Sequence, residues 1–205
     1  MSRKSYFRIA LVSLAWAGMA GISVMAHGQA ASTPAAPSAA AVPAAGVPVK
    51  AEHQDAFYVM GMSVHAKASE ESGGDGQIPG LWQSFIQQGT ASNIPNKVGD
   101  DLYVVYTNMD AAGGTYDYLL GARVTSIDHV PAGMVAKLVP AGKYAIVPSE
   151  VGPAQDVIPA VWQKIWTMTP EQLGGKRAMK ADFEIYNLQG FDPQNAQVDV
   201  HVGLQ

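Results

Sequence analysis

The sequence IPAVWQ at 158–163 repeats the sequence IPGLWQ at 78–83, which lies 80 residues earlier in the chain. The same offset sets LYVVY at 102–106 against DFEIY at 182–186. With a two-residue insertion, a third block would follow: YDYLLG at 116–121 against VDVHVG at 198–203, the latter including His201. Three blocks in one order indicate an internal duplication, with repeat halves at about 55–128 and 129–205.

The two tryptophan-containing blocks have the periodicity of helices. Their apolar residues recur at intervals of three and four, which predicts two amphipathic helices. Pro79 and Pro159 are expected in the first turn of these helices, where a missing amide hydrogen costs little. Asp156 or a nearby residue is expected to cap the second helix. Trp166 continues the apolar stripe of that helix and is predicted to be a core residue.

The remaining blocks have the composition of strands. Together with 57–68, 133–139 and 143–148, they are rich in β-branched and aromatic residues and are separated by glycine and proline turns. Each half then reads strand, helix, strand, strand. We predict an α+β fold in which two such units form one antiparallel sheet with two helices and a ligand cleft between the pseudo-symmetric halves.

The N-terminus has the three parts of a secretory signal. Three basic residues open the chain, an apolar run follows at 9–25, and small residues stand at Gly28 and Ala30. We therefore expect a signal peptide at 1–30, cleaved after Ala30 or Ala26. The alternative, an uncleaved membrane anchor, is disfavoured because the run is shorter than the roughly 20 residues that span a bilayer.

Residues 31–51 are mostly alanine and proline and almost uncharged, so they cannot bury enough surface to offset their ordering entropy. We predict a disordered spacer here, either a tether or a remnant behind the cleavage site, and a folded domain at 52–205. The chain lacks cysteine, which excludes a lipid-attachment cysteine and disulfide bonds. The mature protein is thus expected to be periplasmic or secreted, without stable membrane insertion.

The charge balance disfavours nucleic acid as a partner. Without the three basic residues of 1–30, ten basic residues remain against 17 acidic ones.

Several blocks in one order resemble a known family. They are VPAGKYA at 139–145, IPAVWQKIW at 158–166, DFEIY at 182–186, VDVHVG at 198–203 and, in the first half, YDYLLG at 116–121. They resemble the GyrI-like (gyrase-inhibitor-like) small-molecule-binding domain. That domain is also the effector-binding domain of some AraC-type and MerR-type regulators, and it occurs in integron cassette proteins.

The resemblance extends over about 57–205 and implies the duplicated fold derived above. It also implies a cleft that holds lipophilic, often cationic, aromatic compounds, and some relatives are implied to be hydrolases of strained natural-product rings. The sequence has no helix-turn-helix segment and is expected to be exported. We therefore expect neither transcriptional control nor an intracellular gyrase target.

Glu184 is the leading candidate for a site residue. The repeat places Val104 at the equivalent position, so one charge interrupts an otherwise apolar pattern, and Glu184 matches the acidic position of the family strand. If Glu184 faces the cleft, burial would raise its pKa, whereas a bound cation would keep it ionised. The alternative is an exposed glutamate on a strand.

Aromatic residues at matching or neighbouring positions of the two halves are further candidates for the cleft walls: Trp82, Trp162, Tyr106, Tyr186, Tyr116 and Tyr118. A flat cation would gain about 0.5–2 kcal/mol from each well-placed ring. The alternative carries equal weight, because a tryptophan on the apolar stripe of a helix is usually a core residue.

Cofactor and metal sites are not predicted. The histidines, among them His53, His65 and His129, have no metal-ligand spacing and no cysteine partners. The glycine pairs lack the lysine of a phosphate loop, and no serine lies in a nucleophile elbow.

Three functions remain open from the sequence. The first is a periplasmic binding protein that sequesters or senses a lipophilic cationic or aromatic compound through Glu184 and the aromatic rings. The second is a hydrolase-like enzyme on the same scaffold, with Glu184 as general base and a tyrosine as acid. The third is a protein-interaction module with a vestigial cleft. The sequence identifies neither the ligand nor the oligomeric state.

Overall fold

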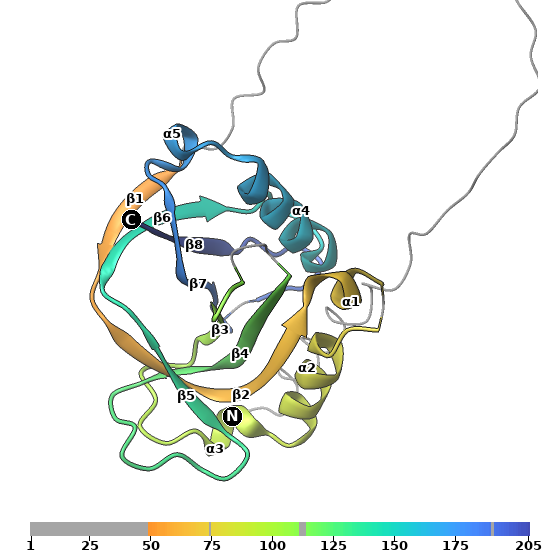
Figure 1. The fold of residues 1–205 in the computed structure, drawn as a ribbon. Coiled ribbons are helices and arrows are strands. Elements are labelled where there is room, and N and C mark those ends of the chain that lie inside the picture. The colour runs from red at the N-terminus through yellow and green to blue at the C-terminus, as the bar shows by residue number, and fades with distance from the viewer. Residues whose placement is uncertain (1–48, 74, 111–113, 190) are drawn as a thin grey trace, which may run out of the picture.

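Antiparallel strands form one eight-stranded sheet in the order β1-β6-β8-β7-β3-β4-β2-β5, as seen in a computed structural model that describes residues 49–73, 75–110, 114–189 and 191–205 (Figure 1). The predicted signal peptide and most of the predicted spacer lie outside the described residues. The strands are β1 (Lys50–Gln54), β2 (Phe57–Lys67), β3 (Leu102–Thr107), β4 (Thr115–Val124), β5 (Val135–Val139), β6 (Gly142–Pro148), β7 (Arg177–Tyr186) and β8 (Asp199–Leu204). The helices are α1 (Ala68–Gly73), α2 (Ile78–Gln87), α3 (Thr90–Asn93), α4 (Ala154–Thr167) and α5 (Pro170–Leu173).

The register of the two central strands confirms the predicted duplication. Leu102 of β3 lies opposite Tyr186 of β7, and Tyr106 lies opposite Asp182. An offset of 80 residues converts the first pair into the second, as a two-fold axis between the strands requires. Val104 lies directly opposite Glu184, and the same offset exchanges these two residues. The pseudo-two-fold axis therefore passes between Val104 and Glu184.

Each half contains a short edge strand that pairs with the other half. β1 pairs with β6, and β5 pairs with β2. β1 begins at Lys50, two residues before the predicted boundary at Glu52 and inside the predicted spacer. The polar sequence of β1 lacks the alternation of a half-buried strand, so only its main-chain pairing with β6 reveals it.

The alignment of the third block with a two-residue insertion is wrong. Gly121 lies opposite Tyr103, and His201 lies opposite Phe183. Since Tyr103 and Phe183 are equivalent at the offset of 80, Gly121 and His201 are equivalent without any insertion. The shared aspartate and glycine of the two blocks suggested a different alignment, but strand register sets the structural one.

The two predicted helices are present, with one difference at a terminus. α2 begins at Ile78 and has Pro79 in its first turn, as predicted. α4 begins at Ala154, so Pro159 is inside the helix rather than in its first turn. Asp156 lies in the first turn of α4, and the N-cap is Pro153 without a side-chain cap, so the predicted cap is also wrong. The Ala154 amide instead donates to the carbonyl of Pro193 at 2.8 Å.

Helices α2 and α4 lie on the same side of the sheet (Figure 1). Each covers its own cluster of buried side chains from the strands beneath it. On the other face, a third cluster that includes Tyr103, Phe183 and Tyr144 is buried by strands alone, because the β1–β2 and β5–β6 segments curl around it. Trp166 of α4 is 63% exposed, so its predicted core position is wrong. It lies at the margin of the stripe formed by Val161, Trp162 and Ile165.

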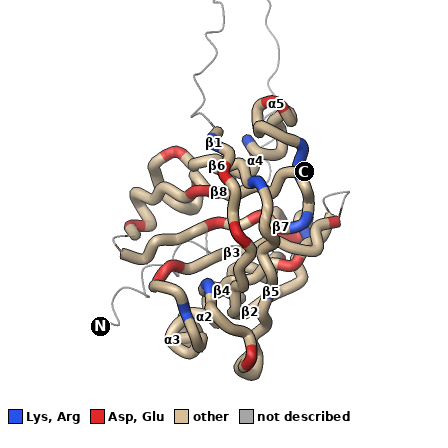
Figure 2. Tube along the Cα trace, turned by 90° about the vertical axis from the view of Figure 1, so that its left-hand side faces the viewer, with Lys and Arg blue, Asp and Glu red and all other residues tan. Residues whose placement is uncertain are grey.

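Acidic and basic positions are interspersed along the trace (Figure 2). None of the helices in the described ranges combines the length and apolar character needed to cross a bilayer.

A pair of glycines permits the sharp curl between β2 and β4. Gly61 and Gly121 lie directly opposite each other. A Cβ atom on Gly121 would lie 2.0 Å from the Met60 carbonyl oxygen, and one on Gly61 would lie 2.0 Å from the Leu120 carbonyl oxygen. These neighbours are main-chain atoms, which cannot rotate away, so both positions require glycine.

Gly121→Ala is expected to lower the free energy of unfolding by about 3 kcal/mol, because the new methyl group displaces the β2 main chain. Gly80→Ala is the matched control, since a Cβ atom there meets no neighbour within 4 Å. This control is expected to be neutral or to stabilise α2 by up to about 1 kcal/mol. Urea denaturation of the three proteins measures both effects, and equal midpoints for Gly121→Ala and wild type would refute the steric argument.

Candidate functional site

Glu184 lies in the middle of β7, on the face that carries α2 and α4. Alternation along the strand directs Phe183 into the cluster on the opposite face, whereas Tyr186 joins Glu184 beneath the helices. The side chain of Glu184 is only 1% exposed, which excludes the alternative of a surface glutamate. The duplication thus places a single buried carboxylate at its pseudo-symmetry axis, opposite Val104.

Three hydrogen bonds satisfy this carboxylate. Its Oε1 atom accepts from the Trp162 indole N–H at 2.6 Å and from the Tyr106 hydroxyl at 2.8 Å. Its Oε2 atom accepts from the Tyr186 hydroxyl at 2.6 Å. The donors come from α4, β3 and β7, so both repeat halves contribute to the site.

Burial raises the pKa of Glu184, and the three hydrogen bonds oppose this rise. Among the described residues, no basic side chain contributes to the electrostatics of this carboxylate. The negative form therefore lacks a counter-charge from the protein. A site of this composition is suited to a cation that supplies the missing charge.

Two pairs of rings on either side of Glu184 follow the pseudo-symmetry. Trp82 and Tyr186 meet edge to face with centroids 5.7 Å apart, and Trp162 and Tyr106 meet in the same manner at 4.7 Å. Each pair joins a helix of one half to a strand of the other. These equivalent contacts confirm that the two tryptophans occupy matching positions.

Tyr118 and Tyr116 of β4 complete the cluster. The Tyr118 hydroxyl accepts a hydrogen bond from the Trp82 indole at 2.8 Å. The ring of Tyr116 lies 5.6 Å from that of Tyr106, and burial followed by the charges of Glu71 and Glu184 raises the pKa of Tyr116 to about 12. The structure therefore brings all seven predicted site residues into one connected group.

Two further residues border the cluster and were not predicted. Glu71 is 5% exposed, and its carboxylate accepts from the main-chain N–H of Gln77 at 2.8 Å at the start of α2. Phe191 packs against Tyr186 with centroids 5.8 Å apart. Glu71 lies outside both repeated blocks, and Phe191 lies in a turn, so neither periodicity nor the repeat singles them out.

The expected cleft is closed by its own rings. Tyr186, Trp82 and Trp162 are 5–8% exposed and fill the space around Glu184. Tyr106 and Tyr116 are half-buried and lie further out. Trp166, whose ring lies 6.4 Å from Trp162, is the exposed end of this series. A ligand can contact Glu184 only after some of these rings move.

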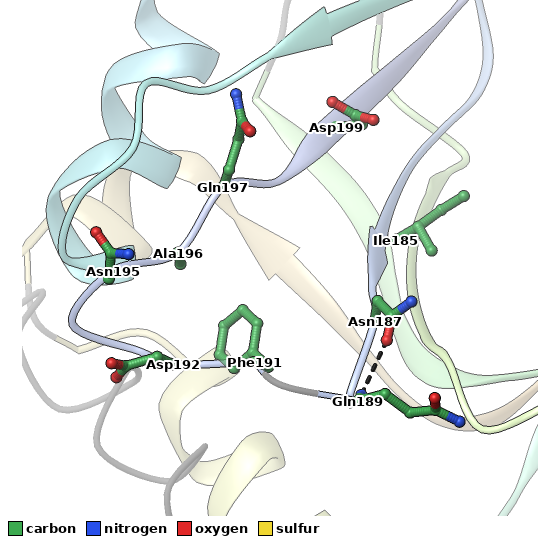
Figure 3. A pocket seen from close by; sticks show the side chains of 9 residues that line it. All are labelled: Ile185, Asn187, Gln189, Phe191, Asp192, Asn195, Ala196, Gln197 and Asp199. Atoms are coloured by element: carbon green, nitrogen blue, oxygen red, sulfur yellow. Dashed lines mark hydrogen bonds between the residues drawn. The ribbon is translucent and has the colours of Figure 1, made fainter.

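Open grooves lie elsewhere on the described surface. One of about 360 Å³ is found at the turn between β7 and β8 (Figure 3), and its lining residues are Ile185, Asn187, Gln189, Phe191, Asp192, Asn195, Ala196, Gln197 and Asp199. Another of about 350 Å³ lies between the end of β6 and α4. Neither groove is lined by a predicted site residue. Phe191 is the one side chain that lines the first groove and also contacts the ring cluster.

Within the described ranges, histidine, aspartate and glutamate side chains form no group of three that could hold a metal ion.

A duplicated α+β fold with a buried carboxylate among aromatic rings defines an effector-binding domain of the GyrI-like class. The profile of the family described as integron-associated effector binding protein (Cass2) matches residues 51–204. The chain belongs to this family.

Relatives of this chain cover most of its length. YobU of Bacillus subtilis (strain 168), named as a candidate transcriptional regulator, is 26% identical over 155 residues, which are 75% of this chain and 95% of YobU. The integron cassette protein VCH_CASS2 of Vibrio cholerae has a similar fold, with a TM-score of 0.59 and 22% identity over 77% of this chain and 96% of that one. The structure of SAV2435 bound to tetraphenylphosphonium is also similar, with a TM-score of 0.61 and 14% identity over 78% of this chain and 94% of that one.

Glu184→Gln is expected to stabilise the protein at alkaline pH. The folded state keeps the Glu184 proton from its ordinary pKa of 4.5 up to the raised value, so the free energy of unfolding falls as pH rises through that window. Glutamine retains the shape and can accept from Trp162 and Tyr106 while donating to Tyr186. Above the window, the variant should exceed wild type by about 1.4 kcal/mol for each unit by which burial raises the pKa.

Chemical denaturation at pH 4 and pH 8 tests this expectation. Glu150→Gln is the control, because Glu150 is exposed and its substitution should not change the pH dependence of stability. A Glu184→Gln variant that is less stable than wild type at pH 8 would contradict the cost assigned to the buried charge.

Proposed function

We propose that this protein binds a small lipophilic cation at Glu184 and thereby sequesters or senses it. The observation that carries the proposal is a fully buried carboxylate with three hydrogen-bond donors but no basic partner among the described residues. An isolated buried charge destabilises a fold, so a core that served packing alone would favour an apolar residue, as Val104 is on the other side of the axis.

The aromatic rings define the class of ligand. Four of them surround the carboxylate, and a cation above an aromatic face gains about 0.5–2 kcal/mol per ring. The hydroxyl and indole donors can remain on Glu184 while the ligand's positive charge lies against the rings. The fold of SAV2435, solved with the aromatic cation tetraphenylphosphonium, supports this class of ligand without identifying the natural one.

Binding requires the ring cluster to open. The half-buried Tyr106 and Tyr116 and the exposed Trp166 mark the side on which the rings are least constrained. Opening exchanges contacts between rings for contacts between rings and ligand. The association rate should therefore lie below that of a preformed pocket, because a conformational change accompanies binding.

The hydrolase alternative receives less support from the geometry. Burial and the charge of Glu184 raise the pKa of Tyr106 and Tyr186 well above the usual tyrosine value. Such hydroxyls hold their protons more firmly, which suits a hydrogen-bond donor and disfavours a general acid near neutral pH. The closed cluster does favour the interaction-module alternative, and the energetic cost of Glu184 argues against it.

Cation binding is expected to depend on the charge of Glu184. Glu184→Gln should weaken binding of a quaternary phosphonium by about 10- to 150-fold, the loss of a hydrogen bond or contact to a charged group. A neutral analogue of equal shape should bind both proteins alike. Isothermal titration calorimetry and intrinsic tryptophan fluorescence measure these affinities.

The raised pKa of Glu184 adds a second readout. A cation stabilises the carboxylate, so binding should release a proton where Glu184 is protonated in the free protein, and affinity should rise with pH until Glu184 is ionised. Glu150→Gln is the control for both effects. Equal affinity of wild type and Glu184→Gln for cation and neutral analogue would remove Glu184 from the site.

We also propose that the protein acts outside the cytoplasm, on the basis of the signal sequence predicted at 1–30. Mass spectrometry of the protein isolated from its host should find a mature N-terminus near residue 31 or residue 27. An intact chain beginning at Met1 in the cytosolic fraction would contradict export.

A further inference from the structure

The two edges of the sheet differ in a manner that the duplication makes informative. β1 and β5 are the terminal strands of the sheet. Lys50 pairs with Ile146, and Val135 pairs with Gly61, so one offset of 85 residues relates both members of these pairs. β1 and β5 are thus equivalent elements at equivalent edges. The fold itself places the same structural demands on both.

Their sequences are nevertheless unlike. β1 reads KAEHQ, and Lys50 forms an ion pair with Glu52. Charged side chains of this kind protect an edge strand from pairing with another chain. β5 reads VAKLV, and the Leu138 side chain is 48% exposed. The equivalent position in β1 is His53, which is also exposed.

Exposed apolar side chains gather around the β5 edge. Of the eight large ones in the described residues, six belong to β2, to β5 or to loops joined to this end of the sheet: Tyr58, Val98, Ile127, Val130, Val135 and Leu138. Tyr58 lies directly opposite Leu138. A solvated edge gains nothing from this composition, whereas a strand that pairs with another surface does.

We infer that β5 is the interface of a two-fold symmetric dimer, in which the β5 strands of two copies pair antiparallel. Antiparallel pairing of a strand with itself satisfies the free main-chain groups of both copies with one set of contacts and closes the assembly at two. The charge in β5 does not oppose it, because the Lys137 ammonium lies 2.9 Å from the Asp117 carboxylate of its own chain. Two copies therefore bring together apolar side chains rather than two free lysines.

Other occupants fit this edge less well. Val49, the first described residue, packs against the cluster under α4, and β1 follows it directly. The segment 1–48 thus joins the domain at the edge opposite β5. Pairing of β5 with the β1 edge of another copy would set Lys50 and Glu52 against apolar residues and would extend into open chains rather than close.

Sedimentation velocity of the purified protein from about 1 μM to about 500 μM tests the inference. The wild type is expected to shift from monomer to dimer with rising concentration. Leu138→Lys should raise the dimer dissociation constant by at least about tenfold, since it places a charge at the centre of each β5 strand pair. His53→Lys, the equivalent change at the β1 edge, should leave that constant unchanged.

Val135→Lys provides a second disruptive variant, and an unchanged melting temperature of the monomer shows that each variant is folded. The inference is overturned if the wild type stays monomeric at the highest concentration, as it would if β5 served a different protein. It is also overturned if His53→Lys weakens the dimer as much as Leu138→Lys does, or if species larger than a dimer form. Cation binding at Glu184 is independent of all these outcomes.

Discussion

A carboxylate buried on a pseudo-symmetry axis must be hydrogen bonded from several directions, and the aromatic arrangement of this protein meets that requirement. Glu184 receives one donor from β3, one from β7 and one from α4. Because Tyr106 belongs to the first half and Trp162 to the second, the carboxylate links the two halves as well as the sheet and a helix. Removing one donor would leave a buried oxygen partly unsatisfied, which costs about 1–3 kcal/mol.

The position on the axis also explains why the site is asymmetric in a symmetric fold. The axis relates position 184 to position 104, and these residues face each other across two strands. Two glutamates there would place like charges directly opposite each other in the core, which is destabilising. One position can carry the charge only if the other does not, and Val104 meets this condition. The two tryptophans diverge accordingly, since Trp162 donates to Glu184 whereas Trp82 donates to Tyr118.

Local sequence patterns predicted the features that local physics determines. The 80-residue repeat and the helical spacing around Trp82 and Trp162 led to the duplication, the central register and the buried position of Glu184. Tertiary contacts determined the rest. β1 exists because β6 offers it a pairing edge, and its polar sequence gives no sign of this. Trp166 lies at the edge of a helical stripe whose width depends on how α4 sits on the sheet. Closure of the cleft depends on ring contacts between residues about 80 positions apart.

Self-closure of the ring cluster has a consequence for selectivity. In the free protein the rings of Trp82 and Tyr186, and those of Trp162 and Tyr106, already contact one another. A neutral aromatic ligand would replace these contacts with others of similar energy, about 0.5–1.5 kcal/mol for each pair of rings, and would gain little. A cation adds its attraction to a carboxylate that lacks a counter-charge, and the free protein has no substitute for that interaction. The closed state therefore competes with neutral ligands more effectively than with cations, so discrimination by charge follows from the packing of the empty site.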